Sequence, residues 1–159
     1  MCSSDLGYEL LVGGNQLQLN QIVVQDPYTV WAVGGVAFEA DANGDGVKNG
    51  VAWLLGAANP SANALNKLPV ASRNGNNLRL TFRCLKSTKR GTAPLKVQSS
   101  SDLGASDPWN SHEAPVPDAD GTVNSVIFDT TDDGDFINVI ADIPAAGAKI
   151  FGRLHSTGN

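Results

Sequence analysis

Apolar and polar residues alternate over several short stretches in the second half of the chain. Residues 78–84 read LRLTFRC, which places Leu78, Leu80, Phe82 and Cys84 on one side of a strand. Because this side is apolar, Cys84 is expected to be a small buried residue rather than a nucleophile. Further strands are predicted at residues 95–100, 123–129, 136–143 and 149–155.

Turn residues separate these stretches, notably Asp120-Gly121 and Asp133-Gly134. Short strands at this spacing predict an antiparallel β-sandwich over residues 78–159. The residues expected in its core are Leu80, Phe82, Val97, Val126, Phe128, Ile140 and Phe151.

The first residues predict a separate β-hairpin. Two β-favouring runs, residues 8–12 and 17–22, flank a turn at Gly13-Gly14-Asn15. Residues 1–6, MCSSDL, resemble the translation of a sequencing adapter. We therefore expect residues 1–25 to combine an artefactual tail with a hairpin from a truncated upstream domain, and we discount Cys2.

Two short helices are expected between residues 26 and 60. Asp26-Pro27 is typical of a helix start, and Gly34-Gly35 should keep that helix short. The second helix should begin at Asn49, as its N-cap, and continue to about residue 57, because the apolar residues there follow a helical spacing. Trp31 and Trp53 are expected to pack in the core or between the helices. Residues 61–77, rich in Asn, Ser and Ala, predict a linker.

Between the helices lies the stretch with the most specific chemistry, DANGDGVKNGVAW at residues 41–53. Side-chain oxygens at the first, third and fifth positions of a tight loop converge on a cation, and a glycine follows at the sixth. The predicted Ca²⁺ ligands are Asp41, Asn43, Asp45, the carbonyl of Val47 and Asn49.

The twelfth position of this loop departs from the motif. A bidentate Glu is expected there, and the chain has Ala52. With so few ligand charges, the predicted dissociation constant is roughly 10⁻⁴ to 10⁻³ M. The alternative is a polar turn without an ion, since Asn-Gly and Asp-Gly pairs also mark turns.

Composition narrows the function classes. The formal net charge of −5 argues against a nucleic-acid partner, and no apolar run is long enough for membrane insertion. The two histidines, His112 and His155, are not part of an HExxH or HxH pattern, as a zinc site would require. The sequence also contains no GxSxG nucleophile motif, Walker loop or dinucleotide fingerprint. A glycosidase pair could be drawn from Asp102, Asp107, Glu113 or Asp120, although such carboxylates are usually solvated turn residues. A second ion could lie at residues 132–135, but a hairpin turn explains DDGD with fewer assumptions.

Two resemblances add to this interpretation. The unit at residues 26–60 resembles dockerin and thrombospondin-type-3 calcium repeats, with Ala52 as the departure. The hairpin, VQSSSDLGASDPW at residues 97–109 and the closing KIFGRLHS resemble the C-terminal region of large secreted, autotransporter-like bacterial proteins. The resemblance implies an extracellular or cell-surface location and a mainly β fold with a small helical part, and it supplies no activity.

The expected function is therefore a non-catalytic structural or spacer module with a weak or degenerate Ca²⁺ loop. Its partners would be a cell-surface glycan or other domains of the same protein. The alternative is a carbohydrate-binding module that uses Trp109 and neighbouring loops.

Overall fold

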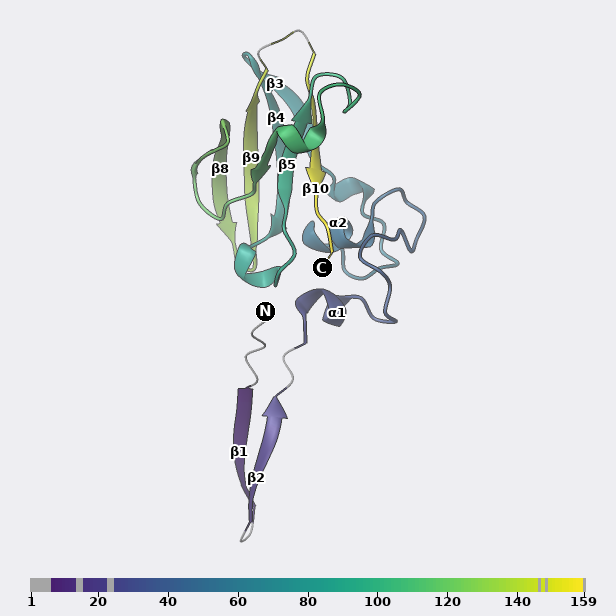
Figure 1. Cartoon of the computed structure of the whole chain (residues 1–159), viewed down its shortest axis with the longest axis vertical. Coiled ribbons are helices and arrows are strands. Elements are labelled where there is room, and N and C mark those ends of the chain that lie inside the picture. Colours follow the sequence, from purple (N-terminus) through teal and green to yellow (C-terminus); the bar gives the residue numbers. More distant parts are fainter. Residues whose placement is uncertain (1–6, 14–15, 23–24, 146, 148, 159) are drawn as a thin grey trace.

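The computed structural model is mainly β, with two small α-helices (Figure 1). It describes the backbone of residues 7–13 and 16–22 and all atoms of residues 25–145, 147 and 149–158. Residues 1–6, including Cys2, lie outside the described part, and so do Gly14 and Asn15, where the turn was predicted.

Two antiparallel sheets form the second half of the chain. The five-stranded sheet has the order β3-β4-β9-β8-β7, and the three-stranded sheet has the order β10-β5-β6. The strands of the first are β3 (Val70–Asn74), β4 (Asn77–Leu85), β9 (Phe136–Pro144), β8 (Val126–Asp133) and β7 (Gly121–Val123). Those of the second are β10 (Phe151–His155), β5 (Lys96–Ser100) and β6 (Glu113–Pro115).

The N-terminal strands form a third, separate sheet. β1 (Gly7–Gly13) and β2 (Gln16–Ile22) are antiparallel, with Leu10 opposite Leu19. Among the described strands they pair only with each other. The predicted hairpin strands are confirmed.

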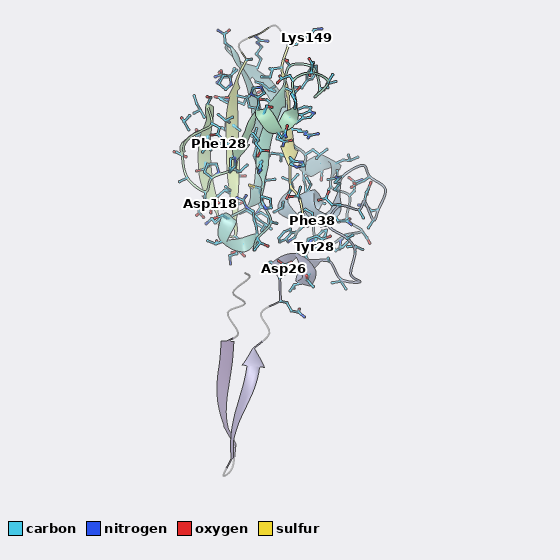
Figure 2. All side chains as sticks on the ribbon, in the orientation of Figure 1. Asp26, Tyr28, Phe38, Asp118, Phe128 and Lys149 are labelled. Carbon is cyan, nitrogen blue, oxygen red and sulfur yellow. The ribbon has the colours of Figure 1, made fainter. Side chains whose placement is uncertain are left out.

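Side chains from both larger sheets contribute to one hydrophobic cluster (Figure 2 shows Phe128 within it). The predicted core residues Leu80, Phe82, Val97, Val126 and Phe128 are buried, and so is Cys84, as expected. Burial raises the pKa of the Cys84 thiol to about 11, so the thiolate form is disfavoured.

The prediction that Ile140 and Phe151 are buried in the core was wrong. Phe151 is 37% exposed, and Ile140 is only partly buried. In β9 the inward residues are Ile137, Val139, Ala141 and Ile143, so Ile140 has the opposite parity. Phe151 lies at the start of an edge strand, where fewer neighbours cover it.

The prediction of a linker over residues 61–77 was also wrong in part. This segment holds the 3-10 helix η1 (Leu65–Lys67) and strand β3, which pairs along its length with β4. All five residues of β3 are exposed. An exposed edge strand has little apolar alternation, and this is why the pattern at residues 70–74 gave no strand signal.

The first helix is short, as predicted, and the second is shorter than predicted. α1 spans Pro27–Trp31, and the Oδ2 atom of Asp26 caps it by accepting from Thr29 N at 3.1 Å. α2 spans Asn49–Leu54, and its N-cap residue is Lys48. The predicted N-cap role of Asn49 was therefore wrong, and the helix ends before residue 57 because Gly56 has a φ of +81°.

The short helix α2 shares the core of the two sheets. Trp53, Leu54 and Leu55 are 5%, 0% and 1% exposed and belong to the same cluster as Phe82 and Phe128. Tyr28 and Phe38 extend this cluster, with ring centroids 4.9 Å apart, and Figure 2 shows them beside each other below α2. Trp31 is half-buried and donates from Nε1 to Ala57 O at 2.7 Å. The predicted packing roles of Trp31 and Trp53 are confirmed.

Replacing Phe128 with Ala should lower the free energy of unfolding by about 3–5 kcal/mol, because the side chain is 2% exposed and its loss leaves a cavity. Chemical denaturation measures this. Its neighbour Ile127 is 50% exposed, so Ile127→Ala is the matched control and should cost less than about 1 kcal/mol. Equal losses in the two variants would contradict the observed register of β8.

Replacing Gly50 with Ala should destabilise the chain, although helix propensity alone favours Ala by about 1 kcal/mol. A Cβ atom at Gly50 would lie 2.1 Å from the Phe38 ring, so the ring would have to move. Phe38→Ala removes the obstacle. Thermal unfolding of both single variants and the double variant tests this, with Gly50→Ala expected to raise stability only in the Phe38→Ala background.

Candidate functional site

The predicted calcium loop is closed by its own side chains. Asp41 accepts from two backbone amides, Gly44 N on Oδ1 at 2.9 Å and Gly46 N on Oδ2 at 2.8 Å. Both glycines have positive φ, +70° and +86°, a conformation that other residues rarely adopt. The local sequence DxNxDG therefore explains the shape of the loop: the glycines permit the turn, and Asp41 holds it.

The other predicted ligands connect the loop to the segment that follows α2. Asp45 accepts from Ala64 N on Oδ2 at 2.7 Å and from Val47 N on Oδ1 at 2.8 Å. Asn43 donates from Nδ2 to Ala62 O at 2.8 Å and accepts from Asp45 N at 3.1 Å. These contacts lower the pKa of Asp45, with the Ala64 amide as the largest cause and the Val47 amide next.

Asn49 lies on the inner side of the loop. It is 2% exposed, and its side chain accepts from Ala42 N at 3.2 Å and donates to Ala37 O at 2.9 Å. Its side chain thus ties the start of α2 to the segment of residues 37–42. The structure therefore places Asn49 as a brace across the loop.

The twelfth loop position does not face a polar space. Ala52 is 6% exposed and packs with Val47, Ala57 and Ala64 in a small apolar cluster. Ala64 therefore contributes twice, through its methyl group to this cluster and through its N–H to Asp45. Sequence reasoning missed Ala62 and Ala64, because they lie 19 residues from their loop partners and alanine carries no motif signal.

The two aspartates of the loop keep part of their hydrogen-bond-accepting capacity. Each of the four carboxylate oxygens of Asp41 and Asp45 accepts one backbone N–H. Asp45 Oδ2 also accepts from Asn43 Nδ2 at 3.2 Å, so a second lone pair remains on the other three oxygens. Within the described residues, no group of three or more His, Cys, Asp or Glu side chains converges on one point. A metal here would thus depend on two carboxylates, with the Asn43 amide and backbone carbonyls completing the set.

Trp109 is fixed by its surroundings. It opens η3 (Trp109–Ser111), and its Nε1 donates to Leu103 O at 3.1 Å. The guanidinium carbon of Arg153 lies 4.3 Å from the ring centroid, and the backbone of Gly104 lies so close that a Cβ there would be 2.6 Å from the ring. Arg153 covers one ring face, and a flat aromatic platform for sugar stacking is therefore not open on that face.

Two of the candidate acidic residues for glycoside hydrolysis share one hydrogen-bond network, because Asp107 N donates to both carboxylate oxygens of Asp102 at 3.2 Å, whereas Glu113 and Asp120 are held by other partners. Asp102 accepts from Ser106 N at 2.7 Å, and Asp107 accepts from Ser101 N at 2.8 Å and lies 2.8 Å from His112 Nε2. Glu113 pairs with Lys96 at 2.5 Å. Asp120 accepts from Thr130 N at 2.7 Å.

The turn at residues 132–135 joins β8 to β9. Asp133 lies opposite Phe136, and Gly134 has a φ of +70°, as a two-residue hairpin turn requires. Asp132 pairs with Lys86, Asp133 with Arg83 and Asp135 with Lys89. The predicted hairpin turn is confirmed, and each of its carboxylates has a cationic partner.

Comparison with protein-family models, with curated proteins and with solved structures returned no match. Among the described residues, every helix is too short or too polar to span a lipid bilayer.

The Asp45 carboxylate should make stability depend on pH. The pKa of Asp45 is lower in the folded chain than in the unfolded chain, where it is about 3.9. The carboxylate therefore stabilises the folded chain fully above the unfolded-state pKa. This stabilisation is lost as the pH falls toward the folded-state pKa. The difference in free energy of unfolding between the wild type and Asp45→Asn should therefore shrink between about pH 5 and pH 2. Urea denaturation across this range measures it.

The control is Asp129→Asn, because within the described residues the Asp129 side chain makes no hydrogen bond or ion pair. Its difference from the wild type at each pH is the baseline against which Asp45→Asn is compared. A constant offset for Asp45→Asn over the same range would show that the two amide contacts do not depend on the charge.

Proposed function

We propose that this chain is a non-catalytic structural module in which a calcium-type loop is fastened onto a β-sandwich. The observation that carries the proposal is the shared core: Trp53, Leu54 and Leu55 follow the loop directly and pack among the buried side chains of both sheets. A binding or spacer role needs such a rigid unit, whereas an acid–base enzyme needs convergent reactive groups. The four candidate carboxylates are instead each engaged by backbone amides, hydroxyl groups or a cation, with Asp102 and Asp107 in one network.

The loop contributes a weak Ca²⁺ site to this module. Asp41, Asn43, Asp45, the Val47 carbonyl and Asn49 are the proposed ligand residues, with an expected dissociation constant of roughly 10⁻⁴ to 10⁻³ M. This range suits calcium concentrations outside cells, and it agrees with the proposed extracellular or cell-surface location. The module would then act as a spacer beside other domains of a secreted bacterial protein.

A carbohydrate-binding role through Trp109 has less support. The ring lies under the Arg153 guanidinium, and its Nε1 is used by Leu103 O. Trp109 is therefore used to hold residues 101–112 together, and this leaves less of its ring for contact with a ligand.

Titration calorimetry with CaCl₂ tests the calcium component. The wild type should bind one equivalent weakly, and Asp41→Asn should abolish the heat of binding because one of the two ligand charges is lost. The matched control is Asp120→Asn, which should leave binding unchanged because Asp120 contacts Thr130 far from the loop. Wild-type heat that survives in Asp41→Asn would reject the site.

The twelfth position gives a second test. Ala52→Glu places a carboxylate in the apolar cluster of Val47, Ala57 and Ala64, so it should lower the melting temperature in EDTA. If the new carboxylate reaches the proposed ion, saturating Ca²⁺ should raise that temperature more than it does in the wild type. Thermal unfolding with and without Ca²⁺ compares the two; no extra gain would mean that position 52 does not face the ion.

A further inference from the structure

A polar cleft of about 320 Å³ lies between the segment that leads into β6 and the turn between β7 and β8. Most of its lining residues have hydrogen-bonding side chains, and two are apolar: Ser99, Asn110, Ser111, His112, Glu113, Asn124 and Ser125, with Ile143 and Pro144. The volume is near the lower end of the roughly 300–1,000 Å³ that is usual for small-molecule sites. The cleft is therefore large enough for a small ligand.

Both walls of the cleft are fixed. Asn124 and Ser125 have φ of +46° and +70° and form the tight turn between β7 and β8. Asn124 donates from Nδ2 to Glu113 O at 2.8 Å and so ties this turn to β6. On the other wall, Ser99 N donates to His112 O at 2.9 Å. The cleft therefore exists before any ligand enters.

Most of the polar side chains that line the cleft have unused hydrogen-bonding capacity. Within the described part of the chain, the side chains of Ser99, Asn110, Ser111 and Ser125 make no hydrogen bond. These groups come from three separate segments, so a local turn does not explain their meeting. Four unused amide and hydroxyl groups around one hollow form a ready set of partners for a polar ligand.

The chemistry of these groups indicates a neutral ligand with hydroxyl groups. Each hydroxyl or amide can both donate and accept, as ligand hydroxyls do. Glu113 is the carboxylate of the lining. It is already paired with the Lys96 ammonium at 2.5 Å, and it accepts a hydrogen bond from Gln98 Nε2 at 3.0 Å. His112 is likewise engaged with Asp107. A charged ligand would thus find no free countercharge, whereas a sugar would find matching groups.

We propose that this cleft binds a neutral mono- or disaccharide unit through Asn110, Ser111, Ser99 and Ser125. Pro144 adds an exposed apolar surface to the lining, against which the C–H face of a sugar ring can lie. The site is distinct from Trp109, whose ring is covered by Arg153, and from the calcium-type loop. It gives the structural module a ligand of its own.

Titration of the ¹⁵N-labelled full chain with maltose, cellobiose and N,N′-diacetylchitobiose, followed by amide chemical shifts, tests the proposal. At least one disaccharide should give saturable shifts centred on residues 99, 110–112 and 124–125, with a dissociation constant on the order of 1 mM. Asn110→Ala and Ser111→Ala should each weaken that binding about five-fold, because each removes one hydrogen bond. Sodium decanoate, an apolar anion, is the comparison ligand and should not shift these amides.

The matched control is Asn138→Ala, since Asn138 is an exposed asparagine on the outer side of β9 and does not line the cleft. It should bind as the wild type does. Absence of saturable shifts with all three disaccharides, shifts centred on another surface, or unchanged affinity in both cleft variants would each overturn the proposal. The amide spectra show directly whether each variant is folded. If one variant misfolds, the other still tests the proposal.

Discussion

The packing of α2 into the β core is the constraint on which the rest of the structure depends. Trp53, Leu54 and Leu55 occupy the cluster that the two larger sheets share, so the loop that precedes them cannot move independently of the sheets. Gly50 belongs to the same arrangement, because the Phe38 ring lies where its side chain would be. Dense packing of this kind transmits small displacements rather than absorbing them. The calcium-type loop is therefore a rigid part of the β module.

A buried cation holds the end of this module together. Arg90 is 4% exposed, and it donates from Nε to Leu85 O at 2.9 Å and from Nη2 toward Asp118 Oδ1 at 3.4 Å. Asp118 in turn accepts from Ser87 N at 2.9 Å. These contacts join the end of β4, the turn after it and the segment that leaves β6. A charge is tolerated at such depth because it is both paired and hydrogen-bonded.

The sequence predicted those elements whose residues carry a local signal. Alternation located β4 and the β8–β9 hairpin, and Asp26-Pro27 located the start of α1. The prediction failed for β3, because this strand has no buried face and so no apolar alternation. It also failed for part of β9, because apolar residues occur on both faces of that strand. Only the pairing of β9 with β4 decides that Val139, and not Ile140, points inward. The motif predicts that Asp41 belongs to the loop. It does not predict the role of Ala64, because Ala64 acts through its backbone N–H, and an alanine side chain does not indicate such a contact. The residues of the polar cleft have the same difficulty, since they meet only through the sheet topology.

The pKa shifts of the carboxyl groups bear on whether any of them can act as a general acid. A general acid that works near neutral pH needs a raised pKa, which burial or a neighbouring negative charge supplies. In the described part of the chain, every Asp or Glu whose pKa is shifted has a lowered pKa. Arg79 lowers the pKa of Asp142, the Lys96 ammonium lowers that of Glu113, and the Thr130 amide lowers that of Asp120. These groups stay ionised because backbone amides and cations surround them. In this chain carboxylates therefore fasten loops and strands, and the same use explains why Asp41 and Asp45 can shape a calcium-type loop without the glutamate that would complete it.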